Sequence, residues 1–288
     1  MRLKTENYKF NGDNPKLIQQ CDEILTDLNN QGYSLTLRSL YYQLVSRNII
    51  KNSQKEYQRL SKLITKARRA GLIDWSHIYD GTRELAQNQH FNNPKDLLEQ
   101  AVSSFRIDLW KTQAIRAEVW VEKSALIGTL ENLCRSLDVG LLASRGNPSA
   151  TVLHETALRI EHNYHYNNQQ TLILYCGDHD ASGLNIPQAI YANLHHVQGM
   201  FTLERLCLNR DQVDRYSLPP NPAKESDPNY KKYEALYGKY SWELDALEPH
   251  VLVEIVKQRL VEVLDIETFN DRVNIQEYYK QQLSEIQL

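Results

Sequence analysis

The segment "TLILYCGDHDASG", residues 171–183, indicates the fold of this chain, because an apolar run gives way there to acidic and small residues. The run "TLILYC" is apolar and has the length of a buried strand. Directly after it, Asp178 and Asp180 stand two positions apart in a turn flanked by glycines. Acidic side chains at a strand end are typical of α/β proteins, which build their sites at the carboxyl ends of parallel strands.

A second apolar run, "AEVWV", residues 117–121, leads directly to Glu122, and a helix is predicted from about Ser124. Weaker strand candidates are "GLLAS", residues 140–144, and "LERLCL", residues 203–208. Helical stretches lie among these runs, over residues 124–137, 150–164 and 185–197. Strands and helices that alternate in this way predict a parallel sheet with helices on its faces. We therefore expect an α/β fold in this part of the chain.

The strand ends would bring three carboxylates together, those of Glu122, Asp178 and Asp180. Three hard oxygen ligands on short loops suit Mg²⁺ that keeps several waters, and such a metal could also hold phosphate oxygens. An isolated pair of aspartates would equally fit a capped turn, so the strand-end glutamate is what favours a metal site. His179, between the aspartates, is expected to be exposed rather than to bind metal.

The N-terminal part is predicted to be helical. "NPKLIQQCDEILTDLNNQG", residues 14–32, reads as one helix, and residues 36–47, capped by Thr36, and 55–70 read as two more. "LIDWSHIYDGTREL", residues 72–85, has the aromatic and turn residues of a short hairpin. Three helices followed by a hairpin make a winged helix, a variant of the helix-turn-helix.

The predicted organisation has three segments. A winged-helix domain covers residues 1–84, a helical linker covers 85–113, and an α/β domain with a helical C-terminal extension covers 114–288. Within the last segment, residues 217–241 read as a loop and residues 248–265 as an amphipathic closing helix.

Composition narrows the class of protein. Of 288 residues, 41% are hydrophobic and 24% charged, as in ordinary globular proteins. There is no run of 18 apolar residues and no signal peptide, so we expect no membrane association and a cytoplasmic location. The four cysteines are scattered without metal-binding spacing, which argues against a disulfide framework or a zinc site.

The stretch "LRSLYYQLVSR", residues 37–47, contains two adjacent tyrosines. On a helical wheel, Tyr41 lies on the apolar arc and is predicted to pack in the core. Tyr42 lies about 130° from the centre of that arc, beside Arg38, and is predicted to be exposed. Phenol ionises only near pH ~10, and a nearby cation favours the phenolate, so Tyr42 has the surroundings of a nucleophile. A surface tyrosine that merely contacts a cation is the alternative.

Positive charge is concentrated around these tyrosines. Residues 36–83 contain ten basic and three acidic residues, a charge of +7. Because the whole chain has a net charge of −3, the remaining residues together carry −10. On the third predicted helix, a basic stripe recurs at helical spacing and consists of Arg59, Lys62, Lys66 and Arg69. Such a stripe can contact a phosphate backbone, and it has few acidic neighbours in the sequence, although a solvated helix face remains the alternative.

Together these motifs resemble a known family. "EVWVEK" with "GDHDASG" resembles a Toprim domain, whose metal site is a strand-end glutamate and a D-x-D pair. "RSLYYQL" on a winged helix, preceding Toprim, resembles the A subunit of topoisomerase VI and the related meiotic double-strand-break transesterase. The resemblance covers residues 36–83 and 117–247.

The resemblance implies a Mg²⁺-dependent enzyme that cleaves duplex DNA through a 5′-phosphotyrosyl link. Tyr42 would be the nucleophile and Arg38 the motif arginine, while Glu122, Asp178 and Asp180 would hold Mg²⁺. The working form would be a homodimer in which the tyrosine of one protomer faces the metal site of the other.

The chain also departs from the family. It is shorter than a usual A subunit, and Ala181 stands where the family commonly has proline. It has no glycine-rich phosphate loop, so an ATPase of the B type would be a separate partner. This indicates a compact, stand-alone relative of plasmid or phage type, acting on nucleoid, plasmid or phage DNA. A Toprim nuclease that uses water and a non-catalytic DNA-binding protein are the alternative functions.

Overall fold

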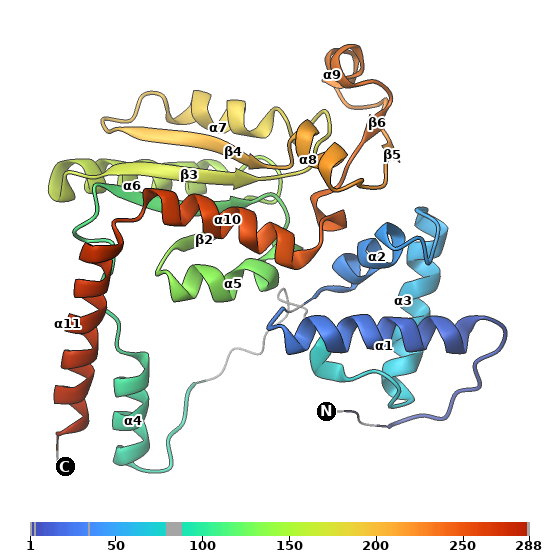
Figure 1. The fold of residues 1–288 in the computed structure, drawn as a ribbon, viewed down its shortest axis with the longest axis horizontal. Coiled ribbons are helices and arrows are strands. Elements are labelled where there is room, and N and C mark those ends of the chain that lie inside the picture. Colours follow the sequence, from blue (N-terminus) through green and yellow to red (C-terminus); the bar gives the residue numbers. More distant parts are fainter. Residues whose placement is uncertain (1, 3, 34, 79–87, 287–288) are drawn as a thin grey trace.

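The computed structural model of the protein describes residues 2, 4–33, 35–78 and 88–286. Figure 1 shows a group of N-terminal helices beside a larger part that is built around a sheet. Helix α2 of the first part packs against a short helical turn that precedes the C-terminal helices of the second. This junction joins segments about two hundred positions apart in the chain and places α2 beside the carboxyl ends of the strands.

Three helices form the N-terminal part: α1 (Asn14–Asn30), α2 (Leu37–Ser46) and α3 (Gln54–Arg69). Their bounds agree with the prediction to within the usual uncertainty of helix ends. Thr36 accepts a hydrogen bond from the Ser39 N–H at 3.1 Å, so the predicted cap is present. Apolar faces of the three helices meet in one buried cluster, which includes Leu25, Leu40, Leu44, Leu60 and Ile64.

The second half of the predicted hairpin, residues 79–85, falls on residues that the structure does not describe. The part that is described differs from the prediction, because Trp75–His77 form a 3₁₀ turn, η1. Ile78 makes one parallel bridge with Leu35. The Asp74 carboxylate accepts a hydrogen bond from the Ser76 N–H at 2.9 Å, which closes the turn and explains why a strand does not begin there.

The larger part contains a four-stranded parallel sheet, as the alternating strands and helices predicted. The strands, in the spatial order β2-β1-β3-β4, are β2 (Gly140–Ala143), β1 (Ile115–Val121), β3 (Gln170–Cys176) and β4 (Phe201–Cys207). β1 and β3 are neighbours, and Val121 lies opposite Cys176 at their carboxyl ends. The segments that follow these two strands therefore start side by side.

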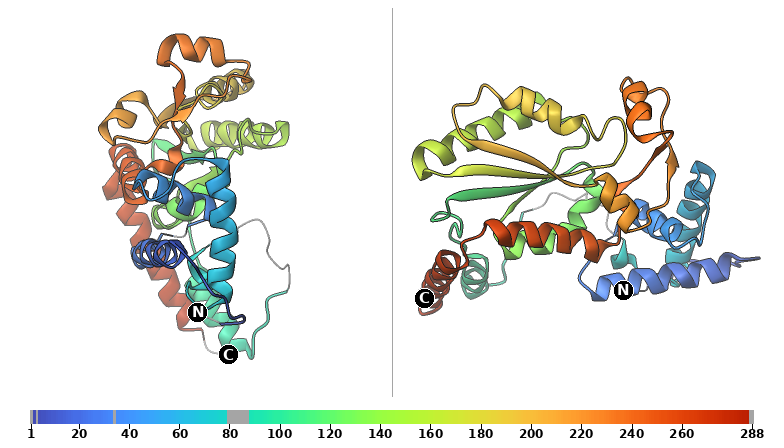
Figure 2. Two further views of the ribbon diagram at one scale, coloured as in Figure 1. Left: turned by 90° about the vertical axis from the view of Figure 1, so that its right-hand side faces the viewer. Right: turned by 45° about the horizontal axis from the view of Figure 1, so that its top comes forward.

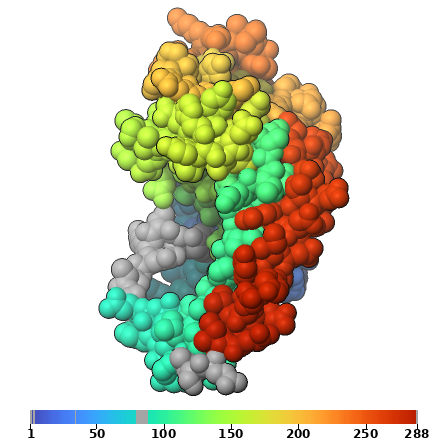
Figure 3. All heavy atoms as spheres, turned by 90° about the vertical axis from the view of Figure 1, so that its left-hand side faces the viewer, coloured from blue at the N-terminus to red at the C-terminus, as the bar shows by residue number. Residues whose placement is uncertain are grey.

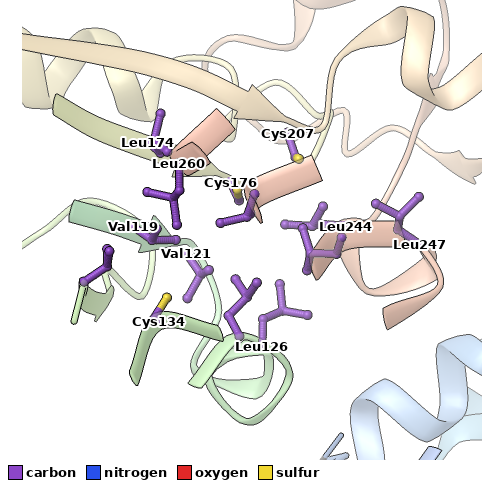
Figure 4. Packing of buried hydrophobic residues seen from close by; sticks show 14 of the residues in the cluster. Val119, Val121, Leu126, Cys134, Leu174, Cys176, Cys207, Leu244, Leu247 and Leu260 are labelled. Carbon is purple, nitrogen blue, oxygen red and sulfur yellow. The ribbon is translucent and has the colours of Figure 1, made fainter. Parts of the chain in front are cut away.

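Helices cover both faces of the sheet (Figure 2). The first face packs against α5 (Ile127–Ser136) and α10 (Pro249–Val263), and the second against α6 (Ala150–Asn167) and α7 (Ile186–Leu194). Side chains of a strand alternate between faces, so Val119 and Val121 point to one layer while Trp120 points to the other. Figure 4 shows the first of these layers, where Val119, Val121, Leu174, Leu260 and three cysteines pack together.

Residues 217–241 were predicted to be a loop, and that prediction was wrong in part. The segment contains a short hairpin of β5 (Asn221–Pro222) and β6 (Tyr240–Ser241), with helix α9 (Tyr230–Tyr237) between the two strands. Tyr233 of α9 is buried against the turn that follows β3. The long-range contact with His179 buries the Tyr233 ring and stabilises the helix. The surrounding sequence is polar and gave no local indication of this contact.

Among the described residues, a short helix, α8 (Arg210–Arg215), follows β4, and two longer helices lie outside the layers of the sheet. α4 (Pro94–Ser104) and α11 (Ile266–Ser284) lie side by side, and Figure 3 shows them packed together below the sheet layers. Phe105 and Tyr279 meet edge to face at 6.2 Å between ring centroids. Across the described ranges, no helix has both the length and the apolar character needed to cross a bilayer.

Candidate active site at the strand ends

The three predicted metal ligands lie at the carboxyl ends of β1 and β3. Glu122 directly follows β1, and its N–H still bonds the Cys176 carbonyl at 2.9 Å, so β1 and β3 end together. The Glu122 Oε2 atom accepts a hydrogen bond from the Asp178 N–H at 2.9 Å. Burial raises the pKa of Glu122, Asp178 and Asp180 above the ordinary carboxyl range. The sequence pattern therefore located these carboxylates at one edge of the sheet.

The glycines of the turn are required by close packing. A Cβ atom at Gly177 would lie 2.7 Å from Glu122 Oε2, and one at Gly183 would lie 2.3 Å from the Asp178 carbonyl oxygen. The Gly183 N–H also donates to Asp180 Oδ1 at 2.6 Å. Only glycine lets the backbone approach the carboxylates this closely, which explains the spacing of the motif.

A partly buried arginine, Arg205 on β4, supports the turn that follows β3. Its guanidinium donates to the carbonyl oxygens of Gly183 at 2.8 Å, Gly177 at 3.0 Å, Asp178 at 2.6 Å and Leu208 at 3.0 Å. Charge-assisted bonds to four carbonyls fix the turn more firmly than neutral hydrogen bonds would. Sequence reasoning missed Arg205, because nothing local to β4 marks which loop its side chain reaches.

Lys123 lies at the centre of the acidic cluster. Its Nζ atom is 2.7 Å from Asp178 Oδ2 and 2.9 Å from Asp245 Oδ2, and it also contacts Glu243 Oε2. Burial alone would lower the pKa of Lys123, but Asp245, Asp178 and Glu243 together raise it well above the ordinary value for lysine. The ammonium is thus the internal counter-ion of two buried carboxylates, Asp178 and Asp245, and of the partly exposed Glu243.

Glu122, Asp178 and Asp180 supply the carboxylate oxygens that Mg²⁺ prefers, but they are not arranged as a ligand set in this conformation. Across the part of the chain that the structure describes, no group of three His, Cys, Asp or Glu side chains could hold a metal ion. Asp178 is occupied by Lys123 and by the Leu244 N–H at 2.8 Å. Ligation by all three predicted carboxylates therefore requires the ammonium to release Asp178.

The predicted nucleophile meets this cluster from the other part of the chain. Arg38 and Lys123 flank the Tyr42 ring, with the guanidinium carbon 5.4 Å and the ammonium 5.9 Å from its centroid. Helix α2 is held there by Gln43, which donates to the Leu247 carbonyl at 3.3 Å, and by the ion pair of Arg47 with Glu248 at 3.2 Å. Tyr42, Arg38 and the strand-end carboxylate of Asp178 therefore lie around one ammonium group.

The predicted exposure of Tyr42 was wrong, since its side chain is buried and only 8% of the residue's surface is accessible. The wheel placed it away from the core of the N-terminal helices, but Tyr42 belongs to their buried cluster, and the segment around η3 (Leu244–Ala246) also packs against α2. Burial and Glu243 raise the pKa of the phenol, and Arg38 and Lys123 oppose that rise only in part.

The companion tyrosine behaves as predicted. Tyr41 is buried in the N-terminal core and meets the Tyr57 ring edge to face. Its hydroxyl accepts from the Ser53 N–H at 2.7 Å and donates to Asn52 Oδ1 at 2.9 Å. A buried phenol whose polar atom is already hydrogen-bonded has a structural role.

The predicted exposure of His179 was also wrong. The residue is buried, and its ring lies among Tyr233, Tyr237 and Trp242. The His179 and Trp242 backbones exchange hydrogen bonds of 2.8 and 3.0 Å, so the turn is tied to the segment that leads into η3. Burial lowers the pKa of His179 to about 4, which keeps the ring neutral at pH 7.

The basic stripe lies on the exposed side of α3, which crosses α1 (Figure 1). Arg59 pairs with Glu56 at 3.2 Å and Arg69 with Glu6 at 3.0 Å, so two of the four charges have acidic neighbours. Lys66 lies over the Tyr8 ring at 5.7 Å. Surface ion pairs of this kind are weak and exchange readily for a phosphate partner.

Comparison of the chain with models of known protein families gives no match, and a search of curated proteins gives none either.

Proposed function

We propose that this chain is a Mg²⁺-dependent DNA transesterase similar to the A subunit of topoisomerase VI, with a winged-helix N-terminal domain and a Toprim domain. One observation carries the proposal. Arg38 and Tyr42 from α2 and Asp178 from the end of β3 all lie around the Lys123 ammonium. Two motifs that the sequence marked separately, as nucleophile and as acidic site, are neighbours within one chain, whereas the resemblance implied that they would meet between two protomers.

The proposed reaction is a transesterification in which atoms balance. The Tyr42 Oη atom forms a bond to a backbone phosphorus, and the bond from that phosphorus to the 3′ oxygen breaks. The phenol loses its proton and the departing 3′ oxygen gains one, so the protein stays linked to the 5′ end. Arg38 and Lys123 carry the charge needed to stabilise the phosphate oxygens as negative charge develops there. Bound Mg²⁺ would supply further charge neutralisation at those oxygens.

Duplex DNA would be bound by the basic stripe of Arg59, Lys62, Lys66 and Arg69. The stripe is exposed along α3, and α3 packs directly against α2, which carries Tyr42. A phosphate backbone held along α3 would therefore pass close to the helix of the nucleophile. Cleavage of both strands needs two tyrosines, so we propose a homodimer, and strand passage would need a separate ATPase of the B type.

A water-using nuclease is the second candidate, and the burial of Tyr42 favours it. A phenol with a raised pKa and 8% accessible surface is a poor nucleophile in this conformation. In that case Tyr42 would only contact phosphate, and the acidic cluster would act on water. A DNA-binding protein without catalysis is the third candidate, because Lys123 already neutralises Asp178.

One experiment separates the three. Supercoiled plasmid is incubated with the protein and Mg²⁺, denatured, and analysed with and without protease. The transesterase leaves protein on the 5′ ends of broken strands; Tyr42→Phe loses both cleavage and adduct, while the matched variant Tyr41→Phe retains them. Broken DNA without attached protein, or cleavage by Tyr42→Phe, would favour the nuclease.

The carboxylates are tested in the same assay. Asp178→Asn and Asp180→Asn should each abolish cleavage in Mg²⁺ while duplex binding in EDTA persists, because each change removes a ligand and a charge from a hard-cation site. Normal cleavage by both variants would exclude the acidic cluster as the catalytic site. Duplex binding that is independent of Mg²⁺, with no broken DNA from any protein, would leave only the non-catalytic function.

A further inference from the structure

Two cations beside Tyr42 share two carboxylate oxygens. Glu243 Oε2 accepts from Arg38 Nη2 at 3.1 Å and is also contacted by Lys123 Nζ. Asp245 Oδ2 lies 2.9 Å from Lys123 Nζ and 3.6 Å from Arg38 Nε. Each oxygen therefore bridges the guanidinium and the ammonium, and both cations lie next to the Tyr42 ring.

This arrangement has the oxygen pattern of a bound phosphodiester, with one negative charge more. A phosphodiester offers two non-bridging oxygens that carry one negative charge, and arginine and lysine are the usual partners of such oxygens. Here the two oxygens come from two separate carboxylates of the same chain. We infer that Arg38 and Lys123 form a phosphate-binding site beside Tyr42, which Glu243 and Asp245 occupy, and that Glu243 leaves when a DNA phosphate enters.

Exposure and backbone contacts identify Glu243 as the exchangeable occupant. Its side chain is 23% exposed, whereas that of Asp245 is completely buried. The residues on either side of Glu243 are fixed, because Trp242 exchanges backbone hydrogen bonds with His179 and the Leu244 N–H donates to Asp178 Oδ1 at 2.8 Å. A rotation of the Glu243 side chain alone would free the outer oxygen position while the segment stays docked on α2.

The exchange would also change the surroundings of Tyr42. With Glu243 in place, burial and then Glu243 raise the pKa of the phenol, while Arg38 and Lys123 lower it. Once Glu243 has turned away, the two cations are released from it and are free to hold the phosphate that Tyr42 attacks. The inference rests on the proposed function for the identity of the ligand, and duplex DNA is the probe.

Binding is measured in EDTA, where no cleavage occurs, by fluorescence anisotropy of a labelled duplex over a range of salt concentrations. Glu243→Gln removes the charge of the internal occupant, so it should bind the duplex at least about tenfold more tightly than the parent protein. One additional phosphate contact should steepen the salt dependence by about 0.9 in the logarithmic slope.

Glu248→Gln is the matched control. Glu248 lies in the same interface and pairs with Arg47 at 3.2 Å, so this variant loses one negative charge and one ion pair to α2 without touching the proposed site. It should change affinity less than threefold and leave the slope unchanged. In the double variant Glu243→Gln/Lys123→Gln, the gain in duplex affinity should disappear, because one of the two cations that would bind the phosphate is gone.

Equal gains for Glu243→Gln and Glu248→Gln would overturn the inference, since they would report only a general loss of repulsion. Absence of any gain for Glu243→Gln would overturn it as well. The two proposals fail separately. If Glu243→Gln alone gains duplex affinity in EDTA but no variant forms a covalent adduct, the phosphate site stands and the transesterase is rejected. If adducts form but Glu243→Gln does not change duplex affinity, the transesterase stands and the phosphate site is rejected.

Discussion

Replacing Lys123 by methionine should destabilise the fold strongly. The side chain is 16% exposed and its ammonium contacts three carboxylates, of which Asp245 is fully buried and Asp178 is 6% exposed. Removing one partner of a buried ion pair typically costs about 3–5 kcal/mol, because the remaining charge is left uncompensated. Arg38 still pairs with Glu243 and Asp245 in the variant, so we expect the lower end, about 3 kcal/mol.

The assay is urea unfolding at pH 7 in EDTA, followed by tryptophan fluorescence. Trp110, Trp120 and Trp242 are all buried in the sheet-containing part and report on its unfolding. Lys280→Met is the matched control, because Lys280 is comparably covered, 20% exposed, and pairs with Glu277 at 2.7 Å on the surface. Loss of that surface pair should cost less than about 1 kcal/mol.

The pH dependence of the loss has a definite sign. Burial already raises the folded-state pKa of Asp178 above its ordinary value, and removal of the ammonium raises it further. A carboxyl with a raised folded pKa destabilises the fold at pH values above that pKa, and the penalty is relieved as the pH falls and the group becomes protonated. The difference between Lys123→Met and the parent protein should therefore be largest near pH 7 and shrink under acidic conditions.

Magnesium provides the second half of the test. If Asp178 can bind Mg²⁺ once the ammonium is gone, the ion should stabilise Lys123→Met more than the parent protein, by about 2.7 kcal/mol at one hundred times its dissociation constant. A loss below about 1 kcal/mol in EDTA would refute the role of Lys123 as counter-ion. A full loss that Mg²⁺ does not relieve would instead argue against metal binding at Asp178.

Three further outcomes are expected. Glutamine at all four positions of the basic stripe, Arg59, Lys62, Lys66 and Arg69, should weaken duplex binding and flatten its salt dependence by about 0.9 per lost phosphate contact. The control is the double variant Lys231→Gln/Lys232→Gln; an equal effect of the control, or an unchanged slope for the stripe variant, would show that the stripe only faces solvent. Tyr41→Phe removes the hydroxyl that bonds Ser53 and Asn52, so urea unfolding should show a loss of about 1–3 kcal/mol with cleavage retained. Gly183→Ala would place a Cβ 2.3 Å from the Asp178 carbonyl oxygen and should abolish cleavage by shifting the turn. The control Gly140→Ala, whose Cβ would lie 3.8 Å from the Glu118 side chain, should cleave normally, and cleavage by Gly183→Ala would contradict the geometry of the turn.

Much of the architecture was predictable from local sequence. The apolar runs before Glu122 and Asp178 form neighbouring parallel strands, and Thr36 caps the helix that it was expected to cap. The glycines around Asp178 and Asp180 already indicated a tight turn. These features are readable because periodicity, caps and turn residues act over a few positions, so the sequence alone contains their physical cause.

The environment of the site was decided only by the tertiary structure. A helical wheel describes one helix, so it could not reveal that Tyr42 would join the buried cluster of the N-terminal helices or that the segment around η3 would pack on α2 from the far end of the chain. The pairing of Lys123 with Asp245 and the support of the turn by Arg205 have the same origin. Burial and charge pairing depend on which distant segments meet, and the segment that α2 contacts is held by the turn after β3, which bonds Trp242 and Leu244.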